Sequence, residues 1–245
     1  MQKRTRLIGG ALIVALSVLA AGVSWFLFVT MNGGIYSIIL NMRSRPDLDS
    51  PDLQRARTRL EEQIDAEFSR AMEKSSFARY QTSKQDSCYD GVNNWKHQDG
   101  FAHRCTLRVT NFYGFDGDFR NAMLDFEKAL LAAGWHSNIH DMAWSLTNNS
   151  AVAQDRPTGR PANQYPDFIN PYYKGGFALD IGWAQRGETR LFHLENTQAH
   201  NIGWINENNF YDQRKLADVG DVFREVTRDH TYIAAIAISG HYFEN

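Results

Sequence analysis

Cysteine is scarce in this sequence, which has only Cys88 and Cys105 among its 245 residues. One pair permits a single intrachain disulfide, and two cysteines in an oxidising compartment usually form one. We therefore predict a Cys88–Cys105 bond, which in the chain-entropy model would stabilise the fold by about 3 kcal/mol. The alternative is that both are unpaired small core residues.

The sequence also lacks the short motifs that identify common enzyme classes. It contains no G-x-S-x-G elbow, no H-E-x-x-H pair, no Walker loop and no dinucleotide fingerprint. The eight histidines are scattered along the chain. These absences favour a protein without catalytic activity, and we expect no cofactor.

A strong excess of charge of either sign is absent too, since the formal net charge is only −2. Lys3, Arg4 and Arg6 are basic and no acid precedes Met31, so the rest of the chain is more acidic than the total. Nucleic-acid binding rewards dense Lys and Arg, so we expect no nucleic-acid partner.

Charged side chains are missing altogether from Leu7 to Met31. A helix of about 20 apolar residues suffices to cross the hydrocarbon core, so this run predicts a single transmembrane anchor. The basic residues before it predict a cytoplasmic N-terminus and a C-terminal domain outside the membrane. The difference in basic residues between the two flanks of the run is small, because Arg43 and Arg45 follow it.

A cleaved signal peptide is the alternative, with Ala20 and Ala21 as small residues near a processing site. The apolar run continues to Val29, however, beyond the length of a typical signal-peptide core. In either case the main domain is exported. We expect a tip and anchor at 1–31, a linker at 32–50, and an extracytoplasmic domain at 51–245.

The patterns beyond the linker predict an α+β domain. Apolar residues three or four apart predict helices near 51–72, 118–133 and 212–229. Alternation or continuous apolar runs predict strands at 105–113, 138–146, 177–184, 190–194 and 232–242, and turn residues predict loops at 79–104 and 147–173. The order matches an antiparallel sheet with helices on one face, in a ferredoxin-like split βαββαβ arrangement.

The predicted helix at 51–72 carries one apolar stripe that includes Leu53, Leu60, Ile64 and Phe68. Such a stripe packs on another element of the same chain or links the domain to the membrane. The alternative is a short self-associating stalk, because the spacing is close to a heptad repeat.

Aromatic rings and amides occur together in several predicted loops. A flat ring covers the apolar face of a polar ligand, such as a glycan, while amides orient its hydroxyl groups. The candidate ligand-binding residues are Trp95, Tyr165, Tyr172, Tyr173, Phe210 and Tyr211. The alternative is that these rings fasten long loops to the sheet.

Asp116 and Asp118 form an acidic pair that could bind a hard cation such as calcium. Helix capping explains the same residues more simply, so we expect no metal.

These observations favour a membrane-anchored, extracytoplasmic binding domain for a protein partner or a glycan or other envelope component. Two alternatives remain. One is an envelope hydrolase whose Asp/His site only the fold assembles, and the other is a structural subunit that assembles through the 51–72 helix.

Overall fold

The computed structural model describes residues 19–28, 39–40, 42–73, 75–93, 97–137, 142, 171–188, 191–198 and 209–245. The chain divides into two units. The first contains Met1–Pro46, Asp90–Arg104 and Glu244–Asn245, and the second contains Asp47–Tyr89 and Cys105–Phe243.

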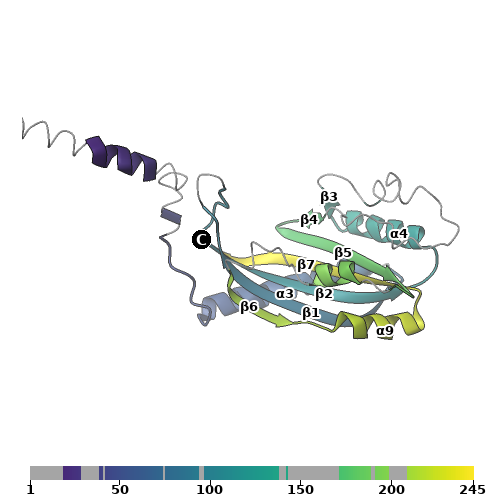
Figure 1. The fold of residues 1–245 in the computed structure, drawn as a ribbon. Helices are drawn as coiled ribbons and strands as arrows, with labels where there is room; N and C mark the ends of the chain where they lie inside the picture. Colours follow the sequence, from purple (N-terminus) through teal and green to yellow (C-terminus); the bar gives the residue numbers. More distant parts are fainter. Residues whose placement is uncertain are drawn as a thin grey trace, which may run out of the picture. The chain divides into compact units, whose positions relative to one another are not determined.

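A seven-stranded antiparallel sheet organises the fold (Figure 1). Its strands are β1 (Ala78–Asp90), β2 (His103–Phe115), β3 (His136–Ser137), β4 (Tyr172–Lys174), β5 (Phe177–Gln185), β6 (Asn209–Lys215) and β7 (Tyr232–Glu244). Their order is β3-β4-β5-β7-β2-β1-β6. The nearly continuous apolar run of β7 fits its central position, since both of its faces are covered along most of its length.

Helices α3 (Pro51–Met72) and α4 (Phe119–Ala132) pack on one side of the sheet, which we call the α3/α4 face. Both helices were predicted. Asp118 caps α4 by accepting a hydrogen bond from the Asn121 amide, and Gly134 follows the helix with a φ of 89°, which only glycine adopts readily. The apolar stripe of α3 is buried against the sheet, as are the inward side chains of α4.

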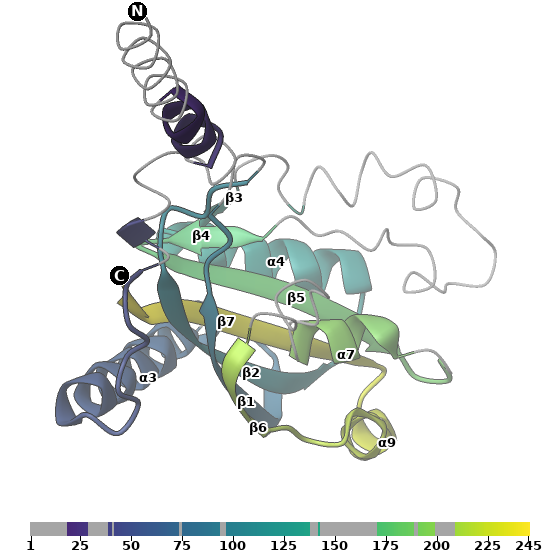
Figure 2. The same ribbon diagram turned by 60° about the vertical axis from the view of Figure 1, so that its left-hand side comes forward.

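Helices α7 (Phe192–Gln198) and α9 (Val219–Asp229) pack on the opposite side, the α7/α9 face. Figure 2 shows these two helices on the other side of the sheet from α3 and α4. The α+β class is therefore confirmed, but helices cover both faces, and the sheet is larger than a ferredoxin-like one. The prediction of helices on one face was wrong, because both α7, which was not predicted, and α9, which was, pack on the side opposite α3 and α4.

Strand β1 falls in the predicted loop at 79–104, and β6 overlaps the start of the helix predicted at 212–229. Their sequences are polar and contain almost no alternating apolar residues. In the structure β6 pairs antiparallel with β1, and polar side chains of β1 such as Ser83, Gln85 and Asp86 are nevertheless buried. Hydrogen bonding and ion pairing, rather than apolar burial, hold these positions, so hydrophobic periodicity gave no signal.

Two further boundaries differ from prediction. Residues 192–198 form helix α7 instead of the strand expected at 190–194. Helix α9 begins at Val219, after its cap Asp218, because 212–215 belong to β6. The strand predicted at 138–146 lies outside the described residues except for Met142, which is buried.

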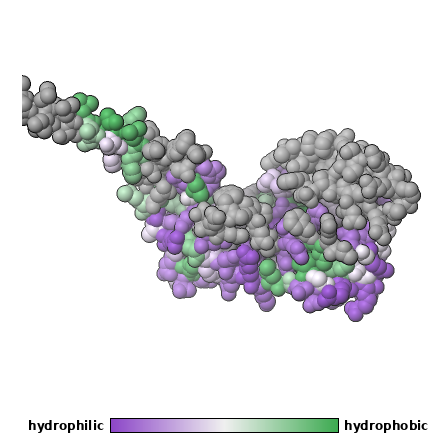
Figure 3. All heavy atoms as spheres, in the orientation of Figure 1, coloured by the Kyte–Doolittle hydropathy of each residue, from purple (hydrophilic) through white to green (hydrophobic). Residues whose placement is uncertain are grey.

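In the first unit, residues 19–28 are helical. Their apolar side chains are exposed, with Leu19 64% and Phe26 67% accessible, and Figure 3 shows this helix as a hydrophobic stretch. In the part of the chain that the structure describes, no helix is long and apolar enough to span a bilayer. Residues 7–18 and 29–31 of the predicted anchor lie outside that part.

The first unit also joins the segment at Arg43–Arg45 to the start of β2. Arg45 contacts both carboxylate oxygens of Asp90, at 3.2 and 2.5 Å. His103 bridges the same carboxylate and the Arg43 carbonyl oxygen, each at 2.8 Å. Burial alone would raise the pKa of Asp90, but hydrogen bonds from Arg45 and His103 outweigh it and hold that pKa below its usual value.

Candidate functional site: a polar groove on the sheet

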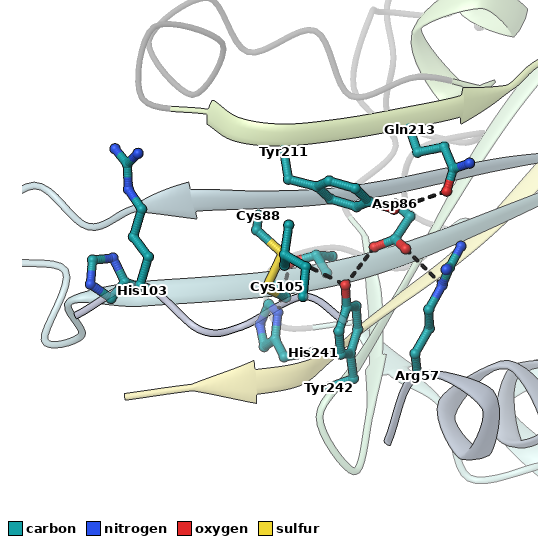
Figure 4. Close-up of a disulfide and its surroundings, with 12 residues drawn as sticks. Arg57, Asp86, Cys88, His103, Cys105, Tyr211, Gln213, His241 and Tyr242 are labelled. Carbon is teal, nitrogen blue, oxygen red and sulfur yellow. Dashed lines mark hydrogen bonds and ion pairs between the residues drawn. A yellow bond between two sulfur atoms is a disulfide. The ribbon is translucent and has the colours of Figure 1, made fainter. Parts of the chain in front are cut away.

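The predicted disulfide is present on the α3/α4 side of β1 and β2. The Cys88 and Cys105 sulfur atoms lie 2.03 Å apart, and both residues are completely buried (Figure 4). Because the sulfur atoms are inaccessible, the bond is a structural crosslink between neighbouring strands.

A buried carboxylate lies beside this disulfide. Asp86 accepts a hydrogen bond of 2.7 Å from the Tyr242 hydroxyl and pairs with Arg57 Nε at 2.7 Å (Figure 4). Burial raises the pKa of Asp86 despite these partners, and burial together with donation to Asp86 raises the pKa of Tyr242. Tyr211 borders the same cluster and lines a cavity of only about 60 Å³ with it. We interpret this cluster as structural.

A larger hollow lies on the α7/α9 face, on the part of the sheet beyond α7. We call it the groove; its volume is about 250 Å³. Its lining residues come from β1, β2, β4, β5, β6 and β7 and from Pro171 before β4. They are Gln85, Ser87, Tyr89, Thr106, Arg108, Pro171, Tyr173, Ala178, Asp180, Asn209, Ser239 and His241.

The groove exists because small side chains form its floor. Ala178 pairs with Ser239 across β5 and β7, and Ser87 adds another small residue on β1. Two tyrosines stand on strands that have three others between them in the sheet, Tyr173 on β4 and Tyr89 on β1. The result is a depression lined mainly by polar residues, whose carbon atoms supply most of its exposed surface, with an aromatic ring towards either side.

A buried ion pair separates the groove from the helix-covered part of this face. Arg108, whose side chain is 5% exposed, binds Asp180 at 2.7 Å. Its Nε and Nη2 both donate to the Thr197 carbonyl oxygen in the last turn of α7, at 3.0 and 2.8 Å. A cation at this position also suits the negative end of the helix dipole.

Helix α7 reaches its position because Gly182 lies beneath it on β5. A Cβ atom at this residue would overlap the Thr197 hydroxyl and the His193 carbonyl oxygen. The end of α7 is fixed further by Gln198, which donates to Ser83 Oγ at 2.7 Å and to the Ala217 carbonyl at 2.8 Å. These buried hydrogen bonds fix the end of α7, whose Thr197 carbonyl in turn holds Arg108 of the groove.

One histidine lines the groove. His241 Nδ1 lies 3.1 Å from Thr106 Oγ1. A histidine beside a hydroxyl is the minimal arrangement for activating an oxygen nucleophile, although a third group that orients the ring completes such a site.

The predicted aromatic residues that the structure describes do not gather in one place. Of these four, only Tyr173 lines the groove. Tyr172 points to the opposite face, where it is fully buried and donates to the Glu127 carboxylate. Tyr211 lines the small cavity, Phe210 is half-buried on β6, and Trp95 and Tyr165 lie outside the described residues.

Sequence reasoning missed most residues of the groove, including Gln85, Asp180, Ser239 and His241. One signal was available in β2, where Thr106 and Arg108 occupy the face opposite Leu107 and Val109. A polar face on a strand this deep in a sheet indicates either an open site or a buried polar network, and here Thr106 and Arg108 line the groove while Arg108 is also bound in a buried network.

The acidic pair is engaged in local hydrogen bonds. Asp118 caps α4, and Asp116 accepts from His230 Nδ1 and the Thr231 amide, each at 2.7 Å. The bond from His230 and then the amide of Thr231 lower the pKa of Asp116. No cluster of three or more potential metal ligands occurs within the described ranges.

No protein-family model matches this chain, and comparisons with curated proteins and with solved structures gave no significant match.

Proposed function

We propose that the chain is a membrane-tethered, extracytoplasmic binding protein that holds a small polar ligand in the groove. The observation that carries this proposal is the groove itself, a hollow of about 250 Å³ formed by small and polar side chains on an otherwise well-packed sheet. Protein interiors and sheet faces are normally filled, so a polar hollow backed by fixed side chains is the default candidate for a binding site.

Two observations support export and tethering. The run from Leu7 to Met31 has no charged side chain, and its described part, residues 19–28, is helical with exposed apolar side chains. The Cys88–Cys105 bond favours an oxidising compartment, because cytosolic thiols are kept reduced.

A binding role is favoured over catalysis by the state of the charged groups in the groove. Arg108 and Asp180 neutralise each other, and Arg108 uses its remaining contacts to hold α7. Both side chains therefore act as fixed lining of the groove, and neither is available as an acid, a base or a nucleophile.

Hydrolysis is the second candidate, and the contact between Thr106 and His241 is the observation that favours it. If His241 activates Thr106, His241→Gln abolishes hydrolysis of a generic ester probe such as p-nitrophenyl acetate while leaving the melting temperature unchanged. Turnover that is absent from the wild-type chain, or equal in the variant, removes this candidate.

A purely structural role receives less support. Assembly through α3 requires an uncovered apolar stripe, whereas Leu60, Ile64 and Phe68 are buried against this chain's own sheet.

Topology is tested with the full chain expressed in a bacterial host. We expect protease added to intact spheroplasts to degrade the C-terminal domain, and we expect both cysteines to resist thiol labelling until reduction. Protection from protease together with two reactive thiols would contradict export.

Ligand binding is tested by filling the groove. Ser239→Trp places an indole over the floor, and Ser69→Trp is the matched control on the exposed side of α3. With a library of small polar fragments, thermal shifts that appear in the wild type and in the control but vanish in Ser239→Trp support the groove. Shifts that survive Ser239→Trp place binding elsewhere.

A further inference from the structure

We infer that the ligand of the groove is a neutral carbohydrate unit, an inference that rests on the binding function proposed above. Three properties of the lining support it: where its hydrogen-bonding groups come from, how its charges balance, and where its rings stand.

The groove offers side chains and not free backbone. It lies on the face of the sheet, where the strands beneath it are paired, as in the continuous β5–β7 register from Ala178↔Ser239 to Gln185↔Tyr232. Extended peptides commonly bind by adding a strand at a sheet edge, which uses main-chain hydrogen bonds. The paired strands beneath the groove have no main-chain groups left for an added strand. The lining therefore favours a ligand that is recognised through its own hydroxyl groups.

The charges of the lining favour a neutral ligand. The Arg108 cation is compensated by Asp180 at 2.7 Å, and two of its nitrogens are directed at the Thr197 carbonyl oxygen. An anion would have to displace Asp180 from its partner, and a cation would have to displace Arg108. Either exchange breaks the Arg108–Asp180 ion pair, whereas a neutral ligand leaves it intact.

The neutral polar groups suit a polyhydroxyl compound. The hydroxyl groups of Ser87 and Ser239 can each donate and accept a hydrogen bond. The amide of Asn209, which also lines the groove, belongs to a side chain that can both donate and accept hydrogen bonds.

The two tyrosine rings of the groove and its volume also fit a sugar. Tyr173 and Tyr89 stand on β4 and β1, and an aromatic ring packs well on the C–H face of a sugar. A volume of about 250 Å³ lies just below the ~300 Å³ lower end of ligand pockets, which fits one sugar ring rather than a long chain.

Isothermal titration of the full chain in detergent micelles tests this inference. The probes are chito-, cello- and malto-oligosaccharides, their carboxylated or phosphorylated counterparts, and a set of unstructured peptides. We expect at least one neutral series to bind, with an affinity that changes less than about twofold between low and high salt, because no charge pair forms. Tyr173→Phe, which keeps the ring, should bind nearly normally, whereas Tyr173→Ala should weaken binding by tenfold or more.

The remaining outcomes separate this inference from the proposed function. A charged probe or a peptide that binds in place of the neutral sugars, and that Ser239→Trp blocks, overturns the carbohydrate assignment and leaves the groove as a binding site. Failure of every probe overturns both. Binding that Ser239→Trp and Tyr173→Ala leave unchanged overturns the groove as the site.

Discussion

Within the residues that the structure describes, the two faces of the sheet differ in how completely they are covered. On the α3/α4 face an apolar and aromatic core extends from α3 across β2, β7 and β5 to α4. On the α7/α9 face a smaller apolar cluster lies under the two helices, and the rest of that face is the polar groove. The difference indicates that the α3/α4 face supplies most of the stability. The α7/α9 face leaves polar side chains exposed that can contact a ligand.

Alternation along single strands produces this contrast. On β2, Leu107 and Val109 face the core while Thr106 and Arg108 face the groove. On β1, Asp86 and Cys88 lie on the disulfide side and Ser87 lines the groove. Substitutions one residue apart should therefore have effects of different kind and size.

The largest expected effect is loss of packing on the α3/α4 face. Phe126 on α4 is 1% exposed and stacks near Phe77, with ring centroids 5.6 Å apart. Phe126→Ala should lower the unfolding free energy by about 3–5 kcal/mol, because it leaves a cavity. Ser87→Ala in the groove should change it by less than about 0.5 kcal/mol. Comparable losses in urea denaturation would break the contrast between the faces.

Removing the disulfide should have the next largest effect. In Cys88→Ala/Cys105→Ala the unfolded chain is no longer crosslinked, and we expect a loss of about 3 kcal/mol. Reduction of the wild-type chain by dithiothreitol should lower its melting temperature towards that of the double variant. An unchanged melting temperature in both cases would show that the crosslink does not stabilise this face.

The ion pair at the edge of the groove should rank third. Arg108→Met removes the guanidinium from Asp180 and from the Thr197 carbonyl, and we expect a loss of about 2 kcal/mol, since Asp180 is 26% exposed and keeps some hydration. Adding Asp180→Asn should recover part of that loss, which a double-mutant cycle measures. A fully additive cycle would mean that the two charges are not coupled.

The smallest effect concerns pH and has opposite signs in two places. Burial raises the folded-state pKa of Asp86 above its ordinary value of 3.8. Protonation of Asp86 therefore stabilises the fold fully below pH 3.8, and this stabilisation is lost as the pH rises through the folded-state pKa. The pKa of Asp116 is lowered, so its contribution is present above the ordinary value and is lost as pH falls.

Unfolding measured from pH 3 to pH 8 checks these signs. Relative to the wild type, Asp86→Asn should become more stable as pH rises, and Asp116→Asn should lose its disadvantage as pH falls. Parallel curves for the wild type and Asp86→Asn would contradict the buried-carboxylate account.

Much of the α3/α4 face could be predicted from the sequence, because apolar packing leaves a periodic pattern. The stripe of α3, the cap and stop of α4 at Asp118 and Gly134, and the alternation of β2 and β5 all gave correct elements. The cysteine count was enough to predict the disulfide. The helices and strands depend on residues close in sequence, and two cysteines allow only one intrachain pairing.

The groove could not be predicted in the same way, because it depends on the order of strands in space. Ser87, Asp180 and Ser239 are far apart in sequence and meet only because β1, β5 and β7 join one sheet. Aromatic residues in predicted loops were a poor guide: Tyr172 and Tyr173 are adjacent, yet one fills the core and the other lines the groove.

Hydrogen exchange of the full chain, with and without the best-binding neutral oligosaccharide, shows directly whether the groove is the ligand site. We expect slower exchange in the strand segments around Ser87, Thr106, Ala178 and Ser239, with α3 and α4 unchanged. Protection confined to α3, α4 or residues 19–28 would contradict this expectation and place the ligand outside the groove.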